Sequence, residues 1–520
     1  MKKCLLLLLS AIMLLSFVAC GPKEKTDTQG NVGAQSTSSG YAAEVVISYS
    51  NDLDSADPYQ STSSQTAWYT NATFRTLVMN DYESGELVGV LAESWEDVSN
   101  GTNTAWQLKL RQGVKFHDGS EFDADDVVFT WNYAKDAVNV VKPIASADNM
   151  VKEVKAIDSH TVRFDLNYAI PDFISYLELK MYSKDAFDTL SKEEAGVIGC
   201  GPYKVGKLVS GVSYGLERFD DYYEGIDQFP TKTITCKVIA DLNVEVAALQ
   251  TGEIQYSFRL PSESLATLEA DKNIKVYTGA GCMSHYLGFN YRHEVWKDLN
   301  MRKAICEAIN KDDIIAIYFE NGATATRSEN FCVPSGKGYT NVTPISYNPE
   351  DAKALLVSCD KVGQEVKIMC SAACKSYAET VQAALNNVGF VAVLDEIDGT
   401  NWTDYKKTGD YDIFVGDYCS YTGALLYNFD RFFSIGGSSN MFGFESQEWE
   451  DLLASVRACS TYDEMVSKFA ECQQWAADNI PLVPIAVNKA FAASTKDIGG
   501  VKLAPSDNLM EVCYLYRTVD

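Results

Sequence analysis

The chain has 520 residues, of which 46% are hydrophobic, and its 44 basic and 71 acidic residues give a net charge of −27. This length exceeds what one hydrophobic core usually serves, so we expect two or more lobes. The acidic surplus argues against a nucleic acid or an anionic lipid as a binding partner, because phosphate binding needs clustered Lys and Arg.

The first twenty residues, MKKCLLLLLSAIMLLSFVAC, have the pattern of an export signal. Two lysines precede an apolar run that is too short for a spanning helix, and small residues precede Cys20. Residues 17–20 resemble a bacterial lipobox, with Phe17 where Leu is usual, and in a lipobox the cysteine is diacylated. We therefore expect a signal peptide over 1–19, a lipid anchor on Cys20 and a location on the outer face of the cytoplasmic membrane. The alternative is an ordinary cleaved signal in which Cys20 has no role.

Residues 20–42 are expected to form a flexible tether. They are rich in Gly, Ser, Thr and Gln and show no apolar pattern. No second long apolar run follows, so we expect the remaining chain to be a soluble body.

The body begins with a strand, EVVISYS, and a helix candidate in which Thr66, Tyr69 and Thr73 recur on helical faces. Two segments of strand character follow, ELVGVLAESWEDVSNGT and NTAWQLKLRQGVKF. The turn residues Asn100 and Gly101 separate them, which predicts a β-hairpin.

The stretch VKFHDGSEFDADDVVFTW, residues 114–131, gathers a histidine and five carboxylates. A local interpretation accounts for them, because VKF ends a strand, Asp118 begins a turn and Asp123 is placed to cap a helix that starts with acidic residues. A calcium loop would need oxygen ligands at alternating positions and Gly at the sixth position, whereas Gly119 directly follows Asp118. The stretch therefore predicts a turn and a helix cap, and no metal site.

Later segments alternate between strand and helix patterns. VKEVKAIDSHTVRFDLNY predicts a second hairpin, and the apolar spacing from Met301 to Ile309 predicts a helix. A further helix begins at Pro349, a residue suited to a first turn. VKIMCS, SYAETVQAALNNVG, FVAVLDEI and DIFVGDY then alternate as expected of α/β construction, and NIPLVPIAVNKAFAAS is expected to return to the first region.

Twelve cysteines follow Cys20, without any CxxC pair. Cys370 and Cys374 have neither a second pair nor a nearby His to complete a zinc site. An exported chain can pair cysteines into disulfides, but the sequence specifies no pairing and is equally compatible with free thiols.

Several motifs carry a resemblance to a known family. They are LAESWEDVSNGTNTAWQLKLRQGVKFHDGSEFDADDVVFTW, GCGPYKV with Cys200 in place of the usual Thr, LGFNYRHEVWKDLNMRKAICEAINKDDI and YNPEDAKALL. From about residue 45 to its end, the chain resembles the family-5 solute-binding lipoproteins of ABC importers, the group of dipeptide-, oligopeptide- and nickel-binding proteins.

The resemblance implies an α/β fold of the two-lobed periplasmic-binding-protein type (type II), a clamshell with an inserted subdomain in the first lobe. We expect lobe 1 over 43–280 plus 488–520, with the insertion at about 81–199, and lobe 2 over 281–487. Hinges are then expected near Gly281 and Val487.

The resemblance also implies that the ligand, a peptide, is held between the lobes. Asp417 matches the aspartate that grips the ligand amine in peptide-binding relatives, although their following Asp-Pro is replaced here by Cys419-Ser420-Tyr421. Aromatic side chains are expected to line the site, and each of them could instead be a packing residue: Tyr418, Tyr421, Trp402, Tyr59 and Trp68.

The leading hypothesis is a monomeric receptor, without cofactor or bound metal, that delivers peptides to an ABC permease. An oligosaccharide or a metal chelate approached by His285 and His293 is an alternative ligand. A secreted enzyme is the opposing class, and the sequence has no GxSxG or HExxH motif. A sensory receptor on the same fold is a third class.

Overall fold

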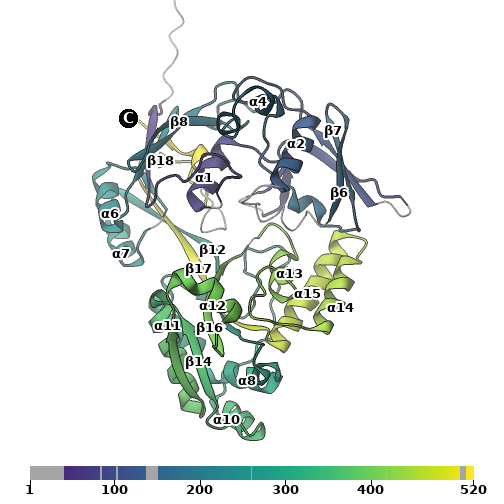
Figure 1. Ribbon diagram of the computed structural model, residues 1–520. Helices are drawn as coiled ribbons and strands as arrows, with labels where there is room; N and C mark the ends of the chain where they lie inside the picture. The colour runs from purple at the N-terminus through teal and green to yellow at the C-terminus, as the bar shows by residue number, and fades with distance from the viewer. Residues whose placement is uncertain are drawn as a thin grey trace, which may run out of the picture. The chain divides into compact units, whose positions relative to one another are not determined.

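The computed structural model describes residues 40–61, 63–81, 85–100, 104–135, 150–258, 260–420, 422–503 and 511–519 (Figure 1). The predicted signal peptide, Cys20, the tether up to residue 39 and Tyr421 lie outside these ranges. Within these ranges, no helix combines the length and the apolar character needed to cross a membrane.

One large sheet runs through the chain in the order β15-β14-β16-β12-β17-β11-β1-β10-β9-β8. Its first part contains β1 (Glu44–Tyr49), β8 (Tyr203–Val209), β9 (Ser213–Arg218), β10 (Thr233–Val238) and β11 (Tyr256–Ser257). β1 is parallel to β10 and β11, whereas β9 is antiparallel to both β8 and β10. Three helices accompany these strands, α1 (Ser64–Thr73), α6 (Leu242–Thr251) and α7 (Ser262–Ala270).

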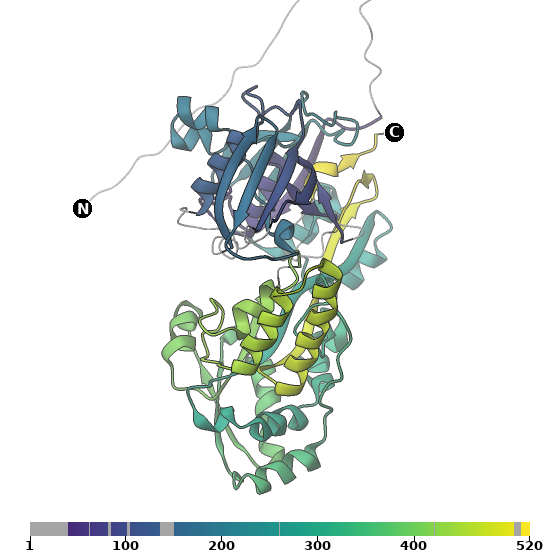
Figure 2. The ribbon, with the colours of Figure 1, turned by 90° about the vertical axis from the view of Figure 1, so that its right-hand side faces the viewer.

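A separate antiparallel sheet has the order β4-β5-β7-β6 and faces the viewer in Figure 2. It consists of β4 (Ala92–Asp97), β5 (Thr104–Leu110), β6 (Val151–Asp158) and β7 (Thr161–Leu166). The two predicted hairpins are thus confirmed, as the pairs β4/β5 and β6/β7. Nearby elements are β2 (Val78–Asn80), β3 (Leu87–Gly89), α2 (Ala124–Lys135), η1 (Phe173–Tyr176), α4 (Lys184–Thr189) and α5 (Lys192–Ala195).

The cap predicted at Asp123 is present. Asp123 Oδ1 accepts the backbone N–H of Asp125 at 2.8 Å, and Asp126 Oδ2 accepts the N–H of Asp123 at 2.8 Å. The carboxylates of Asp123 and Asp126 therefore satisfy backbone N–H groups at the start of α2, as the local interpretation predicts.

The second part of the large sheet has three parallel strands, β14 (Glu365–Cys370), β15 (Val391–Glu396) and β16 (Ile413–Cys419). Its helices are α8 (Leu299–Ala308), α9 (Lys311–Ile317), α10 (Pro349–Ser358), α11 (Lys375–Val388), α12 (Trp402–Thr408), α13 (Tyr427–Phe433), α14 (Gln447–Arg457) and α15 (Tyr462–Asn479). The helical spacing predicted for α8 is confirmed, because Met301, Ala304, Ile305 and Ala308 are its buried residues together with Arg302.

Short elements complete the described chain. They are η2 (Glu294–Lys297), η3 (Glu320–Gly322), β13 (Ala325–Arg327), η4 (Ala372–Cys374), η5 (Gly399–Asn401), β18 (Ile498–Gly499), η6 (Val512–Tyr514) and β19 (Tyr516–Arg517).

Two long antiparallel strands, β12 (Ile274–Phe289) and β17 (Leu482–Thr495), belong to both parts of the sheet (Figure 1). Their register shifts between the pairs Ala280↔Lys489 and Ser284↔Val487. Residues 281–283 of β12 therefore lie opposite a single residue of β17, and we call these three residues the β12 bulge. The hinges predicted near Gly281 and Val487 coincide with this irregularity, while bending there and the predicted lobe boundaries stay predictions.

Candidate ligand-binding site

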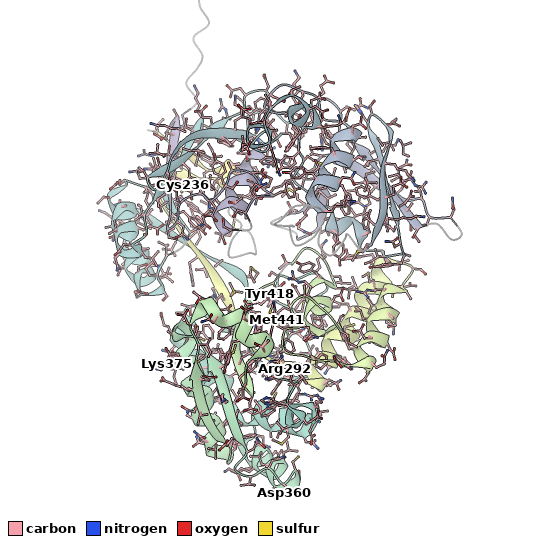
Figure 3. The ribbon with its side chains drawn as sticks, in the orientation of Figure 1. Cys236, Arg292, Asp360, Lys375, Tyr418 and Met441 are labelled. Atoms are coloured by element: carbon pink, nitrogen blue, oxygen red, sulfur yellow. The ribbon has the colours of Figure 1, made fainter. Side chains whose placement is uncertain are left out.

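The carboxyl ends of β14, β15 and β16 define one edge of the sheet, because the three strands are parallel. Ligands of open α/β sheets usually bind at this edge, where the loops after the strands meet. We call the ends of β14, β15 and β16, with the residues that directly follow them, the carboxyl edge. Lys375 begins α11 at this edge and forms an ion pair of 3.0 Å with Glu396 at the end of β15 (Lys375 is labelled in Figure 3).

Asp417 lies exposed on β16, in register with His285 of β12. His285 is 7% exposed, and its Nε2 lies 2.8 Å from Oδ1 of Asn488 on β17. Burial lowers the pKa of His285, whereas the hydrogen bond to Asn488 and the negative charge of Asp417 oppose that shift. Asp417, the predicted amine-binding carboxylate, thus lies on the strand next to the β12/β17 pair.

Lys406 of α12 interacts with both Trp402 and Asp417. Its Nζ lies 4.4 Å from the ring centroid of Phe414 and 5.9 Å from that of Trp402. Burial lowers the pKa of Lys406 to about 8, and the charge of Asp417 opposes this shift. The half-buried Trp402 and the exposed Asp417 are therefore part of one region.

Tyr418 occupies the opposite face of β16 from Asp417, because consecutive residues of a strand alternate between faces. Its ring packs edge-on against Phe432 of α13, with centroids 4.7 Å apart, and burial raises the pKa of its phenol to about 12. Figure 3 labels Tyr418 beside the long crossing strands. Tyr418 as a whole residue is half-buried.

Tyr59 and Trp68 are each only 1% exposed. The Tyr59 hydroxyl donates to the Lys180 carbonyl at 2.9 Å, and the Trp68 ring packs against Tyr49 and Tyr214. Both side chains are core residues in this structure, and their predicted contact with a ligand stays a prediction.

Lys406 and two buried serines near the end of β16 were not predicted from the sequence. Ser284 and Ser420 are 0% and 3% exposed, and neither hydroxyl has a hydrogen-bond partner among the residues that the structure describes. Such buried orphaned hydroxyls are unfavourable. Their position depends on strand pairing, for which the local sequence carries no signal.

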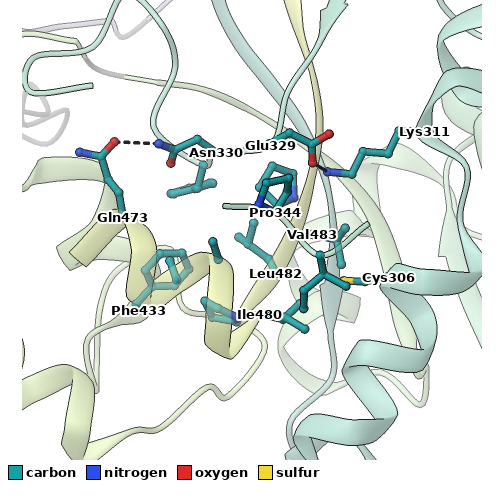
Figure 4. A pocket seen from close by; sticks show the side chains of 16 residues that line it. Cys306, Lys311, Glu329, Asn330, Pro344, Phe433, Gln473, Ile480, Leu482 and Val483 are labelled. Atoms are coloured by element: carbon teal, nitrogen blue, oxygen red, sulfur yellow. Dashed lines mark hydrogen bonds and ion pairs between the residues drawn. The ribbon is translucent and has the colours of Figure 1, made fainter. Parts of the chain in front are cut away.

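A hollow lies apart from the carboxyl edge, between α15, the start of β17 and residues 329–345 (Figure 4). Its polar side chains are already paired: Lys311 with Glu329, and Asn330 Nδ2 with Gln473 Oε1 at 2.7 Å. Because these groups satisfy one another, we assign no ligand role to this hollow.

The two histidines weighed for a metal chelate have different partners. His293 Nδ1 lies 2.9 Å from Asp412 Oδ1, whereas His285 contacts Asn488. Across the described ranges, no three His, Cys, Asp or Glu side chains form a group that could hold a metal ion.

Comparison with known families decides the class of protein. The sequence model of the bacterial extracellular solute-binding proteins, family 5 Middle, matches residues 86–440. The chain belongs to this family. It is therefore an extracellular solute-binding protein and not an enzyme, as predicted from the motifs.

Relatives of this family align over most of the chain. The dipeptide-binding protein of Escherichia coli K12 is 27% identical over 83% of this chain and 86% of its own length. The glutathione-binding protein GsiB of Shigella dysenteriae is 27% identical over 92% of this chain and 95% of its own. A solved structure of the periplasmic binding protein DppA from Helicobacter pylori, in complex with the peptide STSA, has a TM-score of 0.75 at 24% identity and covers 92% of this chain and 98% of its own. The predicted α/β fold of the periplasmic-binding-protein type is thereby confirmed.

Proposed function

We propose that this solute-binding protein is a lipid-anchored receptor that binds peptides between two lobes and delivers them to an ABC permease. The observation that carries the proposal is an exposed carboxylate, Asp417, at the carboxyl edge of a sheet in a family whose matching relatives include a dipeptide-binding protein. Glutathione, the ligand named for the second relative, is itself a peptide.

In this proposal, Asp417 accepts hydrogen bonds from the ammonium group at the amino terminus of the peptide. A charge-assisted bond of this kind strengthens as water is excluded around it. The nearby Lys406 carries charge of the opposite sign to Asp417, so the peptide ammonium has to compete with Lys406 for that carboxylate. Trp402 and Tyr418 are proposed to flank the peptide, and Tyr421, Tyr59 and Trp68 are further predicted contacts.

Binding is proposed to need no chemistry on the peptide. Its favourable free energy comes from desolvating the peptide between the lobes and from satisfying its backbone groups, with closure about the β12 bulge completing the enclosure. The lobes are proposed to be residues 43–280 with 488–520, and residues 281–487.

The membrane attachment rests on the lipobox resemblance of residues 17–20. We expect mass spectrometry of the mature amino terminus to find a diacylated Cys20. An unmodified terminus at any residue after Cys20 would show that the chain has an ordinary cleaved signal instead.

The ligand class is tested by identifying what co-purifies with the folded protein and then measuring thermal unfolding with peptides, oligosaccharides and nickel chelates. We expect peptides in the extract, and a rise in Tm with peptides alone. At a peptide concentration 100 times Kd, the expected stabilisation is about 2.7 kcal/mol. A rise in Tm with an oligosaccharide and none with any peptide would contradict the proposal, as would turnover of the added peptide.

A further inference from the structure

Two cysteines meet at the β12 bulge. The Sγ atoms of Cys282, within the bulge, and Cys419, the last residue of β16, lie 2.8 Å apart. Both residues are thiols in this structure. Their sulfurs are close enough that a small movement of the two side chains completes a disulfide bond.

The backbone holds the two cysteines in this position. Cys419 is in register with Met283, the neighbour of Cys282, and the Ser420 N–H donates to the Cys282 carbonyl at 2.9 Å. The contact is therefore set by strand pairing on both sides of Cys419. Cys370 and Cys374, the pair with the closest spacing in the sequence, differ in that Cys374 Sγ contacts the backbone and hydroxyl of Ser371.

The exposure of the two thiols suits stepwise oxidation. Cys282 is 0% exposed, whereas Cys419 is half-buried and so can meet a reagent from solution. Family membership places the chain outside the cytoplasm, where disulfides form and persist.

We propose that Cys282 and Cys419 form a disulfide bond in the exported protein, which joins the β12 bulge covalently to the end of β16. The oxidant is a disulfide reagent, either a small molecule or an oxidoreductase. The Cys419 thiolate attacks one sulfur of this reagent and releases the first thiolate. The Cys282 thiolate then attacks Cys419 Sγ and releases the second, so that two thiol protons and two electrons leave the protein and the reagent becomes two thiols.

This bond restrains the part of the molecule on which ligand binding is proposed to depend. It ties the end of β16, which carries Asp417 and Tyr418, to the strand that passes between the two parts of the sheet. We expect the oxidised form to bind peptide at least about threefold more tightly, because fewer groups are ordered on binding. This consequence rests on the proposed function, whereas formation of the bond does not.

The bond itself is tested on the full chain, which is incubated with oxidised glutathione, denatured, alkylated without reductant and digested. We expect mass spectrometry to find the Cys282 and Cys419 peptides joined and lighter by two hydrogens than the reduced pair, with the other ten body cysteines alkylated. Alkylation of both Cys282 and Cys419, or glutathione left on Cys419, would overturn the proposal, whatever the ligand is.

Thermal unfolding gives a second readout. Reduction is expected to lower the Tm of the oxidised wild type by about 3 °C or more, because the bond closes a long loop in the unfolded chain. The Tm of the double variant Cys282→Ser with Cys419→Ser should not change on reduction. The Tm of the control variant Cys459→Ser, two residues after the end of α14, should fall like that of the wild type. Equal responses in all three proteins would contradict the assignment, and equal peptide affinity of oxidised and reduced wild type would refute the coupling to binding.

Discussion

His117 illustrates how a residue of a family motif serves the fold. Its ring lies between two glycines of the GCGPYKV segment, with Nε2 3.0 Å from the Gly201 carbonyl and Nδ1 3.3 Å from the Gly199 amide nitrogen. A carbonyl can only accept and an amide N–H can only donate, so Nε2 carries the proton and Nδ1 accepts. His117 is therefore neutral and structural, and burial lowers its pKa to about 4.

This histidine predicts a pH dependence of stability. Its ordinary pKa is 6.5, so the unfolded chain binds a proton as the pH falls through 6.5, whereas the folded chain does not until about pH 4. The contribution is complete above pH 6.5 and is lost as the pH falls toward 4. Between pH 7 and 4.5 we expect the free energy of unfolding to lose about 2 kcal/mol through His117.

Denaturant unfolding of wild type and His117→Gln at both pH values isolates this effect. The variant should be less stable at pH 7 but should lose less stability on acidification. Burial raises the pKa of Asp172 to about 6, so protonation of this carboxyl stabilises the fold as the pH falls, which is opposite to the effect of His117. This contribution is the same in both proteins. The same pH profile in wild type and variant would show that His117 is not buried in its neutral form.

The sequence predicted the cap at Asp123 but not the hydrogen-bond partners of His117. The cap at Asp123 was predictable, because its partners Asp125 and Asp126 are neighbours in the chain. The partners of His117 are more than eighty positions away, and no local periodicity connects them.

At the scale of elements, local patterns predicted most strands and helices but not their neighbours in space. The hairpins β4/β5 and β6/β7 follow from alternation and turn residues, whereas the pairing of β12 with β17 joins segments about two hundred residues apart.

The glycines of the GCGPYKV segment likewise have neighbours in space that are distant in the sequence. A Cβ on Gly199 would lie 2.0 Å from the Thr73 carbonyl oxygen, and one on Gly201 2.4 Å from that of Ala72, so both glycines are needed where the segment packs on α1.

The candidate site depends on the order of the strands. Asp417 was predicted from its match to an aspartate of peptide-binding relatives, and Trp402 as one of several aromatic residues. The parallel pairing of β14 with β15 and β16 brings the end of β16 and the end of β15, which precedes α12, to one edge. Lys406 carries no distinguishing mark in the sequence, because its burial depends on Phe414 and on the packing of α12. The contact between Cys282 and Cys419 likewise follows from strand register and not from cysteine spacing.

For the whole molecule, the strands β12 and β17, with their shifted register, pass between the parts that we propose to be lobes. Hydrogen bonds also join these parts. Asp172 Oδ2 accepts the Leu425 N–H at 2.8 Å, and Ser262 Oγ donates to Glu320 Oε1 at 2.8 Å. The family motifs identified the fold class, but a fold does not determine the ligand, which is set by the side chains of the binding site.

The central claim, that a peptide is held through its amino terminus at Asp417, is tested most directly by calorimetric titration of wild type, Asp417→Asn and Asp404→Asn with one peptide, free and N-acetylated. Asp404 lies exposed on α12 and provides the same change of charge near the site. We expect Asp417→Asn to weaken binding of the free peptide by about 30-fold or more, N-acetylation to weaken binding to the wild type by a similar factor, and Asp404→Asn to have little effect. Unchanged affinity in Asp417→Asn, or equal binding of free and acetylated peptide, would contradict the account.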